Sequence, residues 1–161
     1  MKIFAIVVTY NRLELLKKSI GALRRQQNLD QIVVVNNGSN DGTKEWLDGQ
    51  HDLHVIHQEN VGGSGGFHTG IKVAYDEGAD WIWCMDDDVF PKDGCLDELL
   101  SLVALEETQL DRKKPLGILA PRRVMNGKTF THEFRRYNLT NPLGSLHAEK
   151  LSGEEITPTE I

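Results

Sequence analysis

The sequence predicts an α/β protein built on a doubly wound, mainly parallel β-sheet. Short apolar runs rich in β-branched residues alternate with amphipathic segments over roughly two thirds of the 161 residues. Polar or glycine-rich clusters follow these runs directly, as loops at the carboxyl ends of parallel strands do. With 39% hydrophobic and 26% charged residues, the composition is that of an ordinary globular domain. We therefore expect ligand chemistry at one edge of the sheet.

Two strand–helix pairs open the chain. The apolar run Lys2–Val8 predicts a strand, and the leucine and isoleucine spacing within Arg12–Gln26 predicts an amphipathic helix. The run Gln31–Asn37 repeats the strand pattern. A short helix at Lys44–Leu47 follows a turn in which Asp41 can serve as its cap.

Two further pairs follow. The segment Leu53–Asn60 predicts a third strand, Val61–Gly66 a tight loop, and Phe67–Gly78 a helix with one apolar face. The apolar run Asp80–Met85 predicts a fourth, buried strand. Helical spacing then resumes within Asp93–Glu107.

The pattern weakens toward the end of the chain. We assign residues 1–121 to the α/β domain and residues 122–161 to a partial extension. Pro115–Val124 is the expected fifth strand and Lys128–Asn138 a candidate sixth. Residues 139–161 show little periodicity, so we expect them to cover a site or to lead into a further part.

Charge and cysteine content exclude several classes of protein. A formal net charge of -6 and a pI near 5.5 argue against nucleic acid as a partner. The first apolar run is too short for a signal peptide or a membrane span, which leaves room only for peripheral membrane association. Cys84 and Cys95 match no metal-ligand spacing, and we expect reduced thiols in a cytoplasmic protein.

Three consecutive aspartates follow the fourth strand. Like charges this close must be solvated, paired or bound to a cation. Mg²⁺ and Mn²⁺ prefer carboxylate oxygens and commonly bind one or two of them together with substrate phosphates. In an extended chain Asp86 and Asp88 point to one side, as metal ligands, while Asp87 points to the other, toward a sugar or ribose hydroxyl. The alternative is that one aspartate caps the next turn and the others are solvated.

The glycine-rich segment beginning at Asn60 matches neither common phosphate-binding pattern. Counted from Gly63, the third glycine of the dinucleotide pattern is replaced by His68, and the lysine of the phosphate-binding loop is missing. Backbone without side chains can still pack closely against a bound group. We expect Asn60, Gly63, Gly65 and Gly66 to contact that group, with a plain tight turn as the alternative.

Two other strand ends carry groups suited to a nucleotide. Thr9, Tyr10 and Arg12 follow the first strand, where a base and a phosphate could lie, with Arg12 as a cation near a diphosphate. Asn36, at the end of the second strand, could read a base edge through its amide. Taken alone, each cluster is explained equally well by helix capping or turn formation. The histidines placed where they could face a site are His68, His132 and His147.

Four motifs together resemble a known family. The stretches VVTYNR, VVVNNGSNDGT, NVGGSGGF and WIWCMDDDVFP, in this order and spacing, resemble the nucleotide-sugar-binding half of family 2 glycosyltransferases, especially the galactofuranosyl- and rhamnosyltransferase-like branch. The resemblance covers roughly residues 1–121. It implies a type A glycosyltransferase fold, a UDP- or dTDP-linked sugar donor, Mn²⁺ or Mg²⁺ on the aspartates, and inverting transfer of a hexosyl, deoxyhexosyl or galactofuranosyl group to a glycan hydroxyl in polysaccharide biosynthesis.

By matching positions, the resemblance implies that Thr9 and Arg12 contact the nucleotide and Asn36 the base, while the three aspartates serve the metal and the sugar. The family usually carries an aspartate where this chain has Asn36. Its general base lies well downstream of the metal motif, and Glu154 and Glu155 stand in a polar tail. We therefore leave the catalytic residue unknown, expect it beyond residue 161, and expect the donor-binding part of a longer enzyme.

Two rival functions stay open at this point. A sugar nucleotidyltransferase also uses an α/β sheet, Mg²⁺ and a glycine-rich loop, but it would carry that loop with a basic residue directly after the first strand, where this chain reads TYNRLELL. A non-catalytic nucleotide- or glycan-binding module would need no general base.

Overall fold

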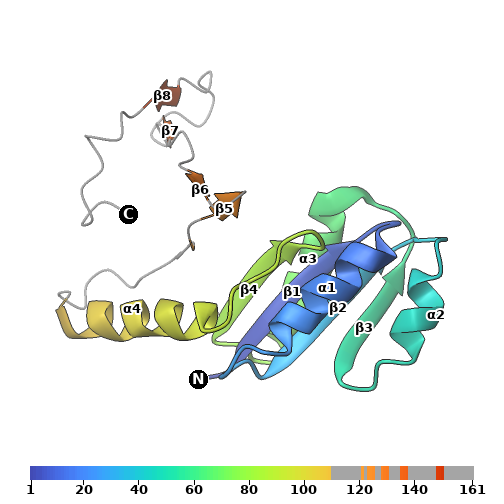
Figure 1. The fold of residues 1–161 in the computed structure, drawn as a ribbon, viewed down its shortest axis with the longest axis horizontal. Helices are drawn as coiled ribbons and strands as arrows, with labels where there is room; N and C mark the ends of the chain where they lie inside the picture. Colours follow the sequence, from blue (N-terminus) through green and yellow to red (C-terminus); the bar gives the residue numbers. More distant parts are fainter. Residues whose placement is uncertain (110–120, 122, 126–127, 131–134, 138–147, 151–161) are drawn as a thin grey trace. The chain divides into compact units, whose positions relative to one another are not determined.

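A computed structural model describes residues 1–109, 121, 123–125, 128–130, 135–137 and 148–150. The chain forms two compact units, Met1–Leu119 and Ala120–Ile161. The first unit holds four strands, β1 (Ile3–Thr9), β2 (Gln31–Asn37), β3 (Leu53–Gln58) and β4 (Trp81–Asp86). They alternate with four helices, α1 (Leu13–Leu23), α2 (Thr43–Asp48), α3 (Gly62–Asp76) and α4 (Cys95–Gln109). Each predicted strand–helix pair is therefore present (Figure 1).

The four strands form one parallel sheet in the order β3-β2-β1-β4. Pairing is in register at the carboxyl ends, where Thr9 lies beside Asn36 and Asn36 beside His57. Val8 pairs with Asp86 on the other side of β1. This arrangement confirms the predicted parallel α/β fold, and it brings the polar strand ends to one edge of the sheet.

Helices cover both faces of the sheet, as a doubly wound fold requires (Figure 1). On one face the buried side chains of α1 and α2 pack against β1, β2 and β4, with Leu16, Ile20 and Leu47 at the centre. On the other face Ala74 and Phe67 of α3 pack against β1 and β2. Strand β1 is buried along its whole length because it is covered on both faces.

The glycine-rich segment is helical, and the prediction of a tight loop at Val61–Gly66 is wrong. Helix α3 begins at Gly62, whose φ of +78° lies in the left-handed region that glycine adopts at no steric cost. A Cβ on Gly66 would lie 2.5 Å from Cγ1 of Val8. A Cβ on Gly70 would likewise collide with Cγ2 of Ile6. The missing side chains therefore let the backbone of α3 rest directly on β1.

Strand β4 is less buried than its apolar sequence predicts. It stands at one end of the strand order of the described sheet, with Trp81, Ile82 and Trp83 half-buried. Cys84, expected to pack as a small apolar residue, is exposed. Neither Cys84 nor Cys95 forms a disulfide bond. The strand therefore lies where the sequence predicts it, but the prediction that it is buried is wrong.

The second unit contains four short strands among its described residues. Strands β5 (Arg123–Met125) and β6 (Lys128–Phe130) form one antiparallel pair, and β7 (Arg135–Tyr137) and β8 (Ala148–Lys150) form another. Most of the fifth strand expected from residue 115 lies outside the described residues. The expected sixth strand contains β6 and β7, which belong to different sheets, and β8 was not expected. Within the described part of the chain, the helices are too short or too polar to cross a membrane.

Candidate functional site

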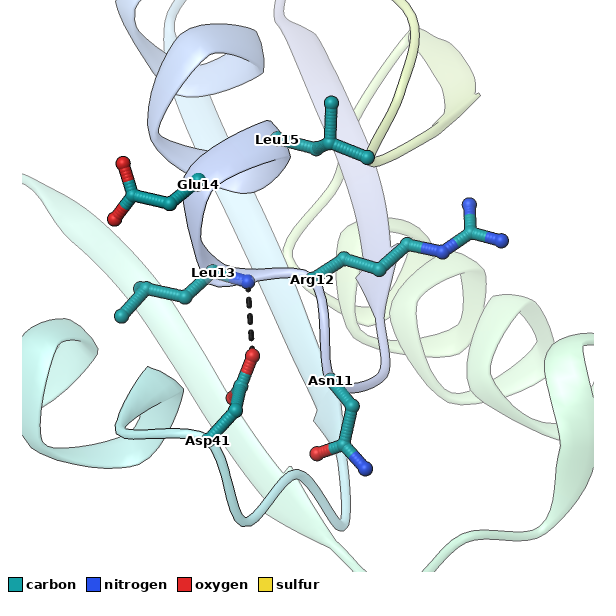
Figure 2. A pocket seen from close by; sticks show the side chains of 6 residues that line it. All are labelled: Asn11, Arg12, Leu13, Glu14, Leu15 and Asp41. Atoms are coloured by element: carbon teal, nitrogen blue, oxygen red, sulfur yellow. Dashed lines mark hydrogen bonds between the residues drawn. The ribbon is translucent and has the colours of Figure 1, made fainter.

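The loops after β1 and β2 are hydrogen-bonded to each other. The N–H of Asn11 donates to Oγ of Ser39 at 3.0 Å, and Oδ1 of Asn11 accepts from the N–H of Asn40 at 2.7 Å. The N–H of Leu13 donates to Oδ2 of Asp41 at 3.0 Å, the bond drawn in Figure 2. Asn11 has a φ of +52°, which a non-glycine residue adopts at some cost. The bonds to the β2 loop hold it in that conformation.

Asp41 joins the starts of two helices. Its Oδ2 accepts from the first residue of α1, while its Oδ1 accepts from the hydroxyl and the N–H of Thr43, the first residue of α2. The N-cap residue of α2 is Gly42, so Asp41, the predicted cap, stands one position before it, although its carboxylate still binds the first residue of both helices. Partial burial pushes the pKa of Asp41 upward, but the bonds from Thr43 and Leu13 outweigh burial and hold this pKa below its ordinary value.

An open hollow of about 430 Å³ lies in front of this turn. It is lined by residues 11–15 and Asp41. Figure 2 shows Arg12 extending away from Asp41, so its guanidinium is free to reach toward another loop. That loop is the acidic turn after β4.

The β1 loop and the acidic turn meet at Asp87, which is only 4% exposed. The hydroxyl of Thr9 donates to Oδ2 of Asp87 at 2.8 Å. Nη1 of Arg12 lies 3.3 Å from Oδ1 of Asp87 and 3.1 Å from Oδ2 of Asp88. Two predicted site residues, Thr9 and Arg12, are thus in direct contact with the aspartate motif, and Asp87 is the aspartate that both of them bind.

Asp86 and Asp88 are the exposed members of the motif. The side chain of Asp88 is 49% exposed, and Asp86 is exposed at the end of β4. Among the residues that the structure describes, no three Asp, Glu, His or Cys side chains converge on one point as a ready-made metal cage. Asp86, together with the lone pairs of Asp88 that Arg12 leaves free, fits a Mg²⁺ or Mn²⁺ ion that takes its remaining ligands from substrate phosphates and water. The donor set therefore suits the predicted metal, with substrate completing the site.

Asn36 is 3% exposed, and both ends of its amide have partners. Its Nδ2 lies 3.1 Å from Nδ1 of His57, and its Oδ1 accepts from the N–H of Ser39 at 3.0 Å. The histidines that sequence reasoning singled out do not include His57; His68 is exposed on α3, and the other two lie outside the described residues. The signal that could have found His57 is the strand register, since Asn36 and His57 are paired neighbours.

The β3–α3 loop is tied to β2 through Asn37, a residue that sequence reasoning did not assign to the site. Its Nδ2 donates to Oδ1 of Asn60 at 3.0 Å and to the carbonyl of Gly62 at 3.1 Å. Gly63 is exposed, and a Cβ there would meet nothing within 4 Å. Gly65 is half-buried, and a Cβ on it would press on Val61. Of the predicted glycines, Gly63 is therefore the one open to a ligand.

Comparison with known proteins places this geometry in a family. A family model for glycosyl transferase family 2 matches residues 4–139. Galactofuranosyltransferase GlfT1 from Mycolicibacterium smegmatis is 40% identical over 92 residues, which cover 55% of this chain and 30% of that protein. This chain thus spans about a third of the length of that relative.

Two solved structures share the fold. S. aureus TarS 1-349 in complex with UDP-GlcNAc has a TM-score of 0.56 and 21% identity, covering 66% of this chain and 32% of that chain. The mannosyltransferase PcManGT from Pyrobaculum calidifontis, in complex with GDP-Man and Mn²⁺, has a TM-score of 0.53 and 23% identity, covering 64% and 32%. The fold is the type A glycosyltransferase fold that the motifs predict. Because the family model extends over most of the chain, this chain belongs to glycosyl transferase family 2.

Proposed function

We propose that this chain binds a nucleoside diphosphate sugar and serves an inverting glycosyltransferase that passes the sugar to a glycan hydroxyl. The contact between Thr9, Arg12 and the aspartate motif carries the proposal, because it brings a half-exposed cation and the exposed carboxylate of Asp88 together at the carboxyl edge of the sheet. UDP-GlcNAc in TarS and GDP-Man in PcManGT support the class of donor. The galactofuranosyltransferase relative supports the transfer of a sugar group.

Arg12 is the residue that we assign to the diphosphate. Its side chain is 52% exposed and contacts Asp87 and Asp88 through a single nitrogen, so other guanidinium hydrogens remain available to phosphate oxygens. The contact with Asp87 holds the cation at the sheet edge before a ligand arrives. Because the two aspartates already hold the guanidinium of Arg12 in one orientation, less conformational entropy is lost when the diphosphate binds.

The loops after β1 and β2 are the parts of the chain that we assign to the base of the donor. Tyr10 is 47% exposed, and its flat ring can stack on a base. Asn36 keeps one amide hydrogen and one lone pair beyond its bonds to His57 and Ser39, which is enough to meet one base edge. We propose a uracil or thymine base, because the N3–H of such a base can donate to the amide oxygen and its carbonyl oxygen can accept from the amide nitrogen.

Asp86 and Asp88 are the residues that would hold Mn²⁺ or Mg²⁺, since both are exposed at the end of β4. The bound ion would neutralise charge on the leaving diphosphate as a Lewis acid. The complex of PcManGT with Mn²⁺ supports a divalent ion in this fold. Asp87 can reach a sugar or ribose hydroxyl only through the lone pairs that Thr9 and Arg12 leave free.

The sugar itself is assigned to the loop before α3 and the aspartates together. Gly63 offers exposed backbone, and Asn60 keeps its amide hydrogens for a hydroxyl, since the bonds that the structure shows for its side chain use only the oxygen. Gly65 and Gly66 support this loop by letting α3 lie close to its neighbours. Inversion also needs a general base near the acceptor hydroxyl, and we assign none of the described residues to that role. A cytoplasmic location and a part in polysaccharide biosynthesis belong to the same proposal.

Calorimetry tests the proposal directly. UDP, dTDP and GDP are titrated into the chain with Mn²⁺ and again with a chelator, and donor hydrolysis is followed with UDP-linked sugars. We expect metal-dependent binding of UDP or dTDP. Formation of a nucleotide sugar from a nucleoside triphosphate and a sugar phosphate would support a nucleotidyltransferase instead. If a nucleotide or glycan binds equally well with Mn²⁺ and with the chelator, and no donor is hydrolysed, the result would support a non-catalytic binding module.

A further inference from the structure

A chain of hydrogen bonds runs from the surface of α2 to the loop after β2. Oδ1 of Asp48 lies 2.9 Å from Nε2 of His57, and Nδ1 of His57 lies 3.1 Å from Nδ2 of Asn36. Oδ1 of Asn36 accepts from the N–H of Ser39, and the hydroxyl of Ser39 accepts from the N–H of Asn11. Four successive bonds thus connect α2 to both loops of the candidate site.

The backbone N–H of Ser39 determines which atom donates and which accepts in each of these bonds. The backbone N–H of Ser39 can only donate, so the atom of Asn36 that faces it is the amide oxygen. The amide nitrogen must then face His57, and Nδ1 of the ring must accept. The ring hydrogen is left on Nε2, where it donates to the carboxylate of Asp48.

We propose that His57, as the Nε2–H tautomer, is a positioning residue for the base end of the donor site. By accepting from Nδ2 it fixes the amide orientation of Asn36, and the amide oxygen in turn holds the turn that begins at Gly38. This inference rests on the proposed function, because the group that the turn would meet is the nucleotide. Nothing in the role requires His57 to touch the substrate.

The burial pattern fits a support placed behind the site. The side chain of His57 is 29% exposed on the side of α2, whereas Asn36 is 3% exposed. A second histidine on the same strand provides a contrast. His54 lies on the opposite face of β3, because side chains alternate along a strand, and its Nδ1 lies 3.1 Å from Oε1 of Glu77. His54 therefore has a carboxylate partner and no contact with Asn36 among the bonds that the structure shows for its side chain.

Three variants separate positioning from general packing. His57→Phe keeps a ring of similar size but removes the acceptor. His57→Asn restores an amide oxygen near the place of Nδ1, and His54→Phe serves as the matched control. Each protein is titrated with UDP in the presence of Mn²⁺. Nitrogen-15 NMR follows the side-chain amide of Asn36, the N–H of Ser39 and the ring tautomer of His57.

We expect the wild type to show the Nε2–H tautomer at neutral pH. His57→Phe should bind UDP about tenfold more weakly, the range of one lost hydrogen bond, and should shift both the Asn36 and Ser39 signals. His57→Asn and His54→Phe should bind nearly as the wild type does. Thermal unfolding of all four proteins shows whether lost affinity merely follows lost stability.

Unchanged UDP affinity in His57→Phe, an Nδ1–H tautomer in the wild type, or an equal loss in His57→Asn and His57→Phe would each overturn the inference. A wild type that binds no nucleoside diphosphate would instead refute the proposed function. The two failures are distinguishable, because the tautomer and the Ser39 signal are read without any nucleotide.

Discussion

The hydroxyl of Thr9 donates a 2.8 Å hydrogen bond to the carboxylate of Asp87, 78 positions further along the chain. Both residues are buried, at 1% and 4% exposure. A carboxylate in such a place needs donors if it is to stay ionised. Thr9 and Arg12 are the donors that the structure shows for it, so the end of β1 and the aspartate motif depend on each other.

Thr9→Val should therefore destabilise the protein and weaken donor binding together. Valine keeps the shape of threonine but leaves Asp87 without one of its donors, which typically costs about 1–3 kcal/mol of unfolding free energy. Urea denaturation measures this loss. Thr9→Ser keeps the hydroxyl and should behave nearly as the wild type, and equal stability of the valine and serine variants would contradict the assignment.

Asp88→Asn should abolish the Mn²⁺ dependence of UDP binding and leave the fold intact. Asp88 is exposed and contacts Arg12, so the amide is expected to be tolerated structurally while a metal ligand is lost. Calorimetry with and without a chelator makes the comparison. Asp93→Asn, which alters another exposed carboxylate paired with Arg25, is the control. Metal-dependent binding that survives in Asp88→Asn would remove the residue from the proposed metal site.

Gly66→Ala should lower stability by about 1–3 kcal/mol, the usual range for overpacking a core. The new methyl group would meet Val8, a stiff β-branched residue in the buried central strand. Gly21→Ala is the matched control, because nothing lies within 4 Å of a Cβ at that position in α1. That change should be neutral or raise stability by up to about 1 kcal/mol. The same melting temperature for both variants would show that α3 does not rest on β1 as described.

Gly63→Val should weaken nucleotide-sugar binding with little effect on the melting temperature. A side chain at Gly63 points into open space in the protein alone, so only a ligand packed against this backbone would feel it. Calorimetry and thermal unfolding of the same sample separate the two effects. A variant that binds donor as well as the wild type does would leave Gly63 outside the site.

Acid should loosen the turn that Asp41 holds. Hydrogen bonds keep its pKa below the ordinary value of 3.8, so the stabilisation is fully present above that pH and is lost as the pH falls through the lowered pKa. Wild type and Asp41→Asn are compared by urea denaturation across this range. The difference in unfolding free energy should be constant near neutral pH and should shrink below 3.8. A difference that persists in stronger acid would mean that the charge of Asp41 is not what holds the turn.

Much of the fold follows from local sequence. The runs that form β1 and β2 are apolar and β-branched, and turn-forming residues follow each of them, so their positions could be predicted within a residue or two. The contact of Thr9 and Arg12 with the aspartates also follows in outline, since parallel strands end at one edge.

Other features depend on contacts distant in sequence. Glycine is a poor helix former, so the start of α3 at Gly62 becomes understandable only through the packing of Gly66 and Gly70 on β1. The partnership of Asn36 and His57 requires the register of β2 and β3, which neither segment encodes alone. Helix starts, by contrast, are local, and the role of Asp41 at the start of α2 is therefore predictable to within one residue.

The packing of α3 on β1 also has a periodicity. Gly66 faces Val8 and Gly70 faces Ile6, so four residues of helix run against two residues of strand in the opposite direction. One helical step of this kind advances about 6 Å, and two strand residues advance about 6.6 Å. These two spacings are nearly equal, so both glycines of α3 can face β1 at the same time. A helix shifted by less than one such step would place a side chain against β1 in place of a glycine. A single-residue insertion between Gly66 and Gly70 would turn one glycine about 100° away from the other, so only one of the two could still face β1. The glycine spacing thereby fixes the position of α3 along β1 and, with it, the position of the amino end of the helix.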